Sequence, residues 1–73
     1  MEREVGILER FGRSVREKRV ALGLSQEGFA AKCGLDRTYI SGIERGKRNI
    51  SLRNIYLIAR ALEVTASELM SGL

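Results

Sequence analysis

Hydrophobic residues recur along this chain at every third or fourth position, which is the spacing of an α-helix. One series runs through residues 4–22, where Leu8, Phe11 and Val15 share a side with the stem of Arg19. Another runs through residues 52–62, and the side chains expected to face inward there are Leu52, Ile55, Ile58, Ala59 and Leu62. No segment alternates hydrophobic and polar residues as a half-buried strand does. The pattern predicts an all-α protein.

Small polar residues and glycines mark where five helices are expected to begin and end. Residues suited to N-terminal capping precede the second to fifth helices: Ser25, Asp36, Ser51 and Thr65. Glycines suited to helix ends follow the first three: Gly23, Gly34 and Gly46. Thr65 has Glu68 three positions later, the spacing of a capping box, which predicts a short fifth helix over 66–72.

The length and composition indicate one small globular domain covering residues 1–73, with 44% hydrophobic and 30% charged residues. The chain has a single cysteine, Cys33, and no histidine. An internal disulfide is therefore impossible, and Cys33 is predicted to be a core thiol of a protein in the reducing cytoplasm. No hydrophobic run approaches the ~20 residues of a membrane span, so no membrane partner is expected.

Positive charge is concentrated in the middle of the chain. Residues 32–53 carry a net charge of +4, which equals the net charge of the whole chain. Such a local excess is typical of a surface that binds a polyanion, although an ordinary solvated face has the same composition. Charge alone does not choose between these two interpretations.

The third predicted helix has two different sides. At about 100° per residue, one side is hydrophobic and the other combines arginines with small hydroxyls. The hydrophobic side holds Tyr39, Ile40 and Ile43, and the other holds Arg37, Thr38, Ser41 and Arg45. Gly42 costs about 1 kcal/mol of helix propensity relative to alanine, which indicates that a side chain there would be in the way. The alternative is a plain amphipathic helix with a polar surface.

Residues 25–46 have the arrangement of a helix-turn-helix, with a turn centred on Gly34. Gln26 lies in the first turn of its helix, where free N–H groups can meet a phosphate. The residues that follow the third helix, Lys47, Arg48 and Asn49, are also suited to backbone phosphates. For Tyr39, packing on the core and contact with DNA remain equal alternatives.

Residues 11–70 resemble the Cro/repressor class of helix-turn-helix domains. The positions that carry this resemblance are Leu24, Ser25, Gln26, Glu27, Ala30, Gly34, Ile40, Ile43, Glu44, Arg45 and Gly46. Within that class, the segment RTYISGIERGKRNIS closely resembles the controller proteins of bacterial restriction–modification systems. Gly28 departs from the class, which usually has a helix former there.

The resemblance implies a small homodimeric regulator that binds a symmetric double-stranded DNA operator upstream of its own gene and the endonuclease gene. Such regulators activate at low occupancy and repress at high occupancy, and RNA polymerase is a further candidate partner. The resemblance also implies base reading by Arg37, Thr38 and Ser41. The residues expected to contact the DNA backbone are Gln26, Tyr39, Arg45, Lys47, Arg48 and Asn49. In this class Arg19 and Glu44 often form a partly buried salt bridge; independent solvated charges are the alternative.

Residues 55–73 are predicted to form the dimer interface. Leu57 lies about 100° outside the inward sector of the fourth helix, and Leu69, Met70 and Leu73 follow as spare hydrophobic residues. Two alternatives remain: the C-terminal segment folds back and covers Leu57 within one protomer, or some of these residues, Leu69 above all, belong to the core.

An enzyme is not expected, because the chain lacks histidine, metal-ligand spacing and a glycine-rich phosphate loop, and no cofactor or metal is predicted. Two rival functions remain, a prophage-type repressor and an antitoxin or adaptor that uses the same fold to hold a protein. A protein-binding module would favour aromatic or aliphatic anchors on the third helix, where this sequence has Arg, Thr and Ser.

Overall fold

The computed structural model describes residues 4–73, which form five helices and, within that range, no strand. The helices in chain order are α1 (Glu4–Ala21), α2 (Gln26–Cys33), α3 (Arg37–Glu44), α4 (Leu52–Leu62) and α5 (Ala66–Leu69). The prediction of an all-α, five-helix fold is confirmed. Across the described range, no helix is both long and apolar enough to cross a membrane.

The predicted caps are present in the structure. The hydroxyl of Ser25 accepts a hydrogen bond from the backbone N–H of Gly28, and Asp36 and Ser51 cap α3 and α4 in the same way. Thr65 and Glu68 form the reciprocal capping box of α5. Each of these bonds satisfies a donor that the first helical turn leaves free, so local chemistry determines where the helices begin.

The third and fifth helices end earlier than the sequence predicts: α3 ends at Glu44 and not at Gly46, and α5 ends at Leu69 and does not extend to residue 72. The regular part of α3 ends at Glu44, because Gly46 adopts a left-handed φ of 73° and the N–H of Lys47 bonds back to the carbonyl of Gly42. At the end of α4 the left-handed residue is Glu63, with φ of 63°, where glycine is the usual choice.

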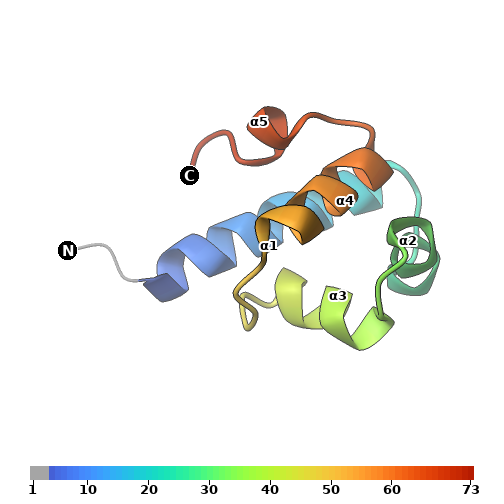
Figure 1. Cartoon of the computed structure of the whole chain (residues 1–73), viewed down its shortest axis with the longest axis horizontal. Coiled ribbons are helices and arrows are strands. Elements are labelled where there is room, and N and C mark those ends of the chain that lie inside the picture. Colours follow the sequence, from blue (N-terminus) through green and yellow to red (C-terminus); the bar gives the residue numbers. More distant parts are fainter. Residues whose placement is uncertain (1–3) are drawn as a thin grey trace.

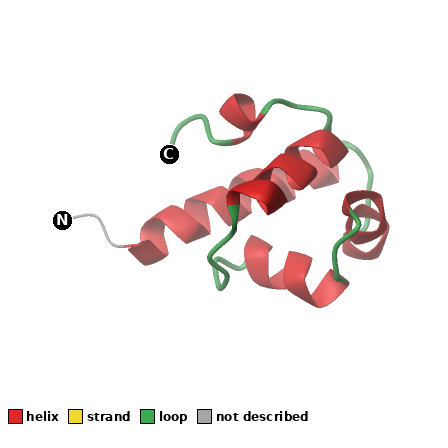
Figure 2. Ribbon diagram, viewed as in Figure 1, coloured by secondary structure: helices red, strands yellow, loops and turns green. Residues whose placement is uncertain are grey.

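The core lies between α1 and α4, with α2 and α3 below it and α5 above it in the view of Figure 1. Figure 2 shows the same arrangement, in which short loops join the helices. The largest fully buried side chains are Val15, Phe29, Ile40, Ile43, Ile58 and Leu69. The second and third helices therefore each bury one side in the core.

Leu52 does not face inward as predicted: its side chain is 80% exposed. It is the first residue of α4, and about 100° per residue places it at the edge of the inward sector, where no other helix covers it. Ala61 is buried instead. Ile55, Ile58, Ala59 and Leu62 pack in or against the core as expected.

A close approach between α1 and α3 fixes the position of the third helix. A Cβ atom added at Gly12 would lie 2.2 Å from the carbonyl oxygen of Ile43 and 2.8 Å from that of Glu44. A Cβ atom added at Gly46, just beyond α3, would lie 2.8 Å from the Cα and 2.9 Å from the backbone nitrogen of Glu9. Only a residue without a side chain lets the two helices meet at this distance.

Candidate nucleic-acid interface

The outer side of α3 is polar and faces solvent. Arg37, Thr38 and Arg45 are exposed and Ser41 is partly exposed. On the inner side Ile40, Gly42 and Ile43 are buried. The structure thus brings together the four side chains predicted to point outward; we call Arg37, Thr38, Ser41 and Arg45 the reading face.

A buried ion pair holds the C-terminal end of α3 against α1. The guanidinium of Arg19 donates to both carboxylate oxygens of Glu44, at 2.7 and 3.0 Å, and also to the carbonyl of Leu24 at 2.8 Å. The two side chains are only 10% and 3% exposed. The hydrogen bond to Glu44 raises the pKa of Arg19, so the guanidinium stays protonated. The predicted salt bridge is confirmed, and it orients the reading face.

Gln26 joins this network from the first turn of α2. Its side-chain amide donates a 3.1 Å hydrogen bond to Glu44. The same amide nitrogen carries a second N–H, and the backbone N–H groups at the start of α2 have no partner inside the helix. The orientation of the Gln26 side chain therefore depends on Glu44, a link that the sequence did not indicate.

Tyr39 and Arg48 form a second polar group at the other edge of α3. The ring of Tyr39 packs against the core, and its hydroxyl accepts a 3.0 Å hydrogen bond from the side chain of Asn54. The guanidinium of Arg48 lies over that ring, 5.4 Å from its centre. The side chain of Arg48 also occupies the space beside Gly42, where an added Cβ would lie 2.9 Å from its Cγ. A side chain at Gly42 would therefore meet the flexible side chain of Arg48 and displace it.

The two basic residues and the asparagine that follow the turn at Gly46 are at the surface. Lys47 and Asn49 are exposed, as is Arg48. The left-handed turn at Gly46 brings this segment back beside α3. The segment therefore runs beside α3, where the backbone N–H of Lys47 bonds to Gly42 and the side chain of Arg48 lies against it.

The residues predicted for the dimer interface do not form one surface. Leu69 is fully buried in the protomer core, so the alternative that it is a core residue holds and its assignment to an interface is wrong. The hydroxyl of Ser14 on α1 donates a hydrogen bond to its carbonyl. Leu57 is half-buried in a hollow shared with Lys32 and Cys33 of α2. Met70 and Leu73 are exposed, at 43% and 39%.

Sequence reasoning missed the most exposed hydrophobic side chains of α4. Leu52 is 80% exposed and Tyr56 is 57% exposed, and they lie one helical turn apart on the outer side of the helix. Arg60 lies over the Tyr56 ring at 5.8 Å from its centre. Their spacing of four residues was the available signal, but Leu52 was predicted to face the core and Tyr56 was not singled out.

Cys33 is buried, as predicted, and burial raises the pKa of its thiol to about 11. In the part of the chain that the structure describes, no group of histidine, cysteine and acidic residues could hold a metal ion.

With this geometry established, comparison with known proteins identifies the family. The Helix-turn-helix family matches residues 15–69. The chain belongs to this family. Its controller-protein branch supplies close relatives: the control protein C.MunI of Mycoplasma sp is 49% identical over 65 residues, covering 88% of each chain. The control protein C.BamHI of Bacillus amyloliquefaciens is 51% identical over 61 residues, covering 82% of this chain and 75% of that one.

Solved structures agree with this assignment. The restriction-modification controller protein C.AhdI of Aeromonas hydrophila has 53% identity and a TM-score of 0.83, covering 85% of this chain and 94% of that chain. Another controller, C.Esp1396I, has been solved as a tetramer in complex with its natural 35 base-pair operator. It has 39% identity and a TM-score of 0.79, and 88% of each chain is covered. The resemblance to restriction–modification controllers is confirmed.

Proposed function

We propose that this chain is a sequence-specific, DNA-binding transcription regulator that controls a restriction–modification system from a symmetric operator. The observation that carries the proposal is the reading face of α3, an exposed set of arginine and hydroxyl side chains on a helix whose orientation is fixed by the Arg19–Glu44 pair. Arginine can bridge guanine O6 and N7, and threonine or serine can bond a base edge or contact the thymine methyl. Arg37, Thr38 and Ser41 are the proposed base readers.

The proposed backbone contacts flank the reading face. Gln26 and the first turn of α2 lie at one edge, and Arg48, Lys47 and Asn49 lie at the other. Arg45 extends the reading face at the C-terminal end of α3. An α-helix with its side chains is about 10–12 Å wide and fills a major groove of about 12 Å, so residues at both edges of α3 meet phosphates.

We propose that two protomers bind together through the outer side of α4. Leu52 and Tyr56 offer exposed hydrophobic surface there. Met70 and Leu73, which come after the neighbouring α5, are exposed as well. Figure 1 shows α5 and the C-terminus on the opposite side of α1 and α4 from α3, so an interface there leaves the reading face free. One protomer measures 36 × 23 × 22 Å, so a two-fold pair can place its α3 helices at the 34–36 Å spacing of successive major grooves.

The alternative of a protein-binding module receives no support from α3. None of its exposed side chains is a large hydrophobic residue, and such residues anchor protein interfaces. The prophage-repressor alternative uses the same surface, and the named controller relatives favour restriction–modification genes instead. The proposed role involves no catalysis and places the protein in the cytoplasm, where promoter DNA is found. An RNA polymerase contact stays a prediction without an assigned surface.

Footprinting on the DNA upstream of its own gene tests this function. We expect two protected segments related by a two-fold axis, with their centres about one helical turn or a multiple of it apart. A duplex of the same length and composition with a scrambled sequence is the control. Equal protection of both duplexes would contradict sequence-specific regulation.

A further inference from the structure

An open cleft borders the reading face where α3 meets α1 and the start of α2. Its volume is about 390 Å³, and the residues that line it are Arg16, Arg19, Gln26, Ser41, Glu44 and Arg45. Ser41 and Arg45 belong to the reading face as well. A second hollow continues along the same junction and adds Glu9 and Arg13. The cleft is therefore the direct extension of the reading face toward α1.

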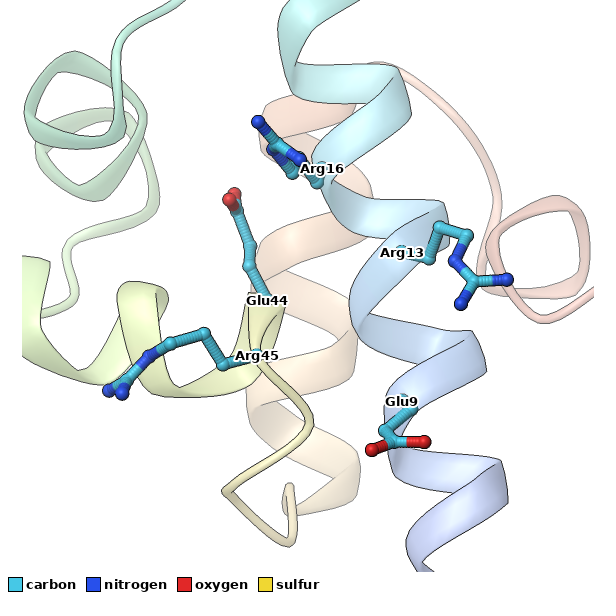
Figure 3. Close-up of a pocket in the computed structure, with 5 residues that line it drawn as sticks. All are labelled: Glu9, Arg13, Arg16, Glu44 and Arg45. Carbon is cyan, nitrogen blue, oxygen red and sulfur yellow. The ribbon is translucent and has the colours of Figure 1, made fainter.

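The cleft carries free positive charge. Glu44 is already neutralised, because its carboxylate accepts two hydrogen bonds from Arg19 and one from Gln26. Arg16 and Arg45 are both exposed, and among the described residues neither has an ion-pair partner. In Figure 3 the side chain of Arg16 points from α1 toward the Glu44 side of the cleft. Two unpaired guanidinium groups in one open cleft favour an anion.

The position of Arg16 mirrors that of Arg48 across α3. At about 100° per residue, Glu44 lies next to the reading face on one edge of the helix and Gly42 on the other edge. Arg16 reaches the Glu44 edge from α1, and Arg48 covers the Gly42 edge from the loop after α3. When α3 fills the major groove, each edge faces one sugar–phosphate wall.

We propose that Arg16 binds a backbone phosphate at the edge of each operator half-site, so that α1 is part of the DNA-binding surface. The proposal rests on the proposed function. It adds a contact from α1, which lies outside residues 32–53, the segment where the sequence concentrates positive charge. Arg13 provides the matched control. It lies one turn earlier on the same helix with the same charge. Arg13 borders the second hollow but not the cleft itself, and in Figure 3 its guanidinium points away from α3.

The test compares Arg16→Gln with Arg13→Gln in titrations against operator duplex at several salt concentrations. Each phosphate contact contributes about 0.9 to the slope of log affinity against log salt. Arg16→Gln should therefore lower the slope by about 0.9 per protomer and weaken binding at 0.1 M salt by roughly eightfold per protomer. Arg13→Gln should leave the slope unchanged, and Arg16→Lys should restore it. Affinity for a scrambled duplex should fall in the same ratio, because a phosphate contact carries no sequence information.

A second arm locates the contact on the DNA. Operator duplexes with one methylphosphonate linkage lack one phosphate charge, and one such position per half-site should weaken the wild type but not Arg16→Gln. The proposal is overturned if Arg16→Gln keeps the wild-type slope, if Arg13→Gln changes the slope equally, or if Arg16→Gln loses discrimination between operator and scrambled duplex. Failure of the wild type to prefer operator over scrambled DNA would instead refute the proposed function, and this inference with it.

Discussion

Replacing Gly12 by alanine should destabilise the protein by roughly 3 kcal/mol or more, although alanine is the better helix former. The change gains about 1 kcal/mol of helix propensity. The new Cβ would lie 2.2 Å from the carbonyl oxygen of Ile43. Carbon–oxygen contacts are ordinarily about 3.3 Å or longer, so α1 and α3 must separate by about 1 Å. Both partners are backbone, so neither can rotate away.

The magnitude follows from what that separation disturbs. Phe11 and Val15 of α1 and Ile40 and Ile43 of α3 are buried in the same core. Overpacking of a core costs about 1–3 kcal/mol and sometimes more, and contact between two backbones places Gly12→Ala above that range, at about 4 kcal/mol. Subtracting the propensity gain of about 1 kcal/mol leaves a net loss of about 3 kcal/mol. At about 4–8 °C per kcal/mol for a domain of this size, the melting temperature should fall by roughly 12–24 °C.

Two other helical glycines serve as controls for the same chemical change. At Gly28 the added Cβ meets only the Ser25 hydroxyl, at 3.2 Å. Gly28→Ala should therefore keep part of the propensity gain and stabilise the fold by about 0.5 kcal/mol. At Gly42 the Cβ meets the flexible side chain of Arg48, so Gly42→Ala should fold normally and lose operator affinity.

Thermal unfolding followed by circular dichroism measures all three variants under one set of conditions. The expected order of melting temperatures is Gly28→Ala above wild type and Gly12→Ala well below it. A Gly12→Ala protein as stable as the wild type would refute the close approach of α1 and α3. A Gly42→Ala protein with full operator affinity would show that the placement of Arg48 beside α3 does not matter for binding.

Three further predictions test the flanking cations, the protomer contact and the buried thiol. Lys47→Ala should lower the salt slope of operator binding by about 0.9 per protomer and leave sequence preference intact, and an unchanged slope would place Lys47 away from the DNA. Leu52→Glu combined with Tyr56→Glu should keep helical circular dichroism but sediment as a monomer at micromolar concentration; a persistent dimer would move the interface elsewhere. Burial raises the pKa of Cys33 from 9.0 to about 11, so the native protein should alkylate slowly at pH 8. The free energy of unfolding should fall between about pH 9 and 11, where the thiol ionises in the unfolded state but not in the native state. Rapid alkylation of the native protein would contradict that burial.

Features that depend on neighbouring residues could be predicted from the sequence. Ser25, Asp36 and Ser51 cap their helices because capping involves a side chain and a backbone donor two or three residues away. The division of α3 into a buried and a polar side follows from helical periodicity in the same way. The Arg19–Glu44 pair spans 25 positions, and only the family resemblance indicated it.

Features that depend on how the helices pack could not be predicted. Leu52 has the right periodicity to be buried, but nothing packs over the first residue of α4. Leu69 was grouped with Met70 and Leu73 as spare hydrophobic surface near the C-terminus, yet α5 packs on α1 and buries Leu69 completely. Periodicity shows which residues share a side of a helix, and only tertiary packing shows which side is covered. Arg16 illustrates the same limit, since its place beside the reading face depends on the crossing of α1 and α3.

The central claim is that the reading face of α3 recognises base sequence, and Arg37→Ala tests it most directly. Arg37 is exposed at the start of α3, and its loss should leave the fold intact. Equilibrium titration of wild type and variant against operator and scrambled duplexes, at one salt concentration, gives four affinities. We expect operator binding to weaken by about 1–3 kcal/mol per contact and scrambled-duplex binding to change much less, because a bidentate base contact is removed. Equal losses on both duplexes would show that Arg37 contacts only the phosphate backbone and would contradict the account.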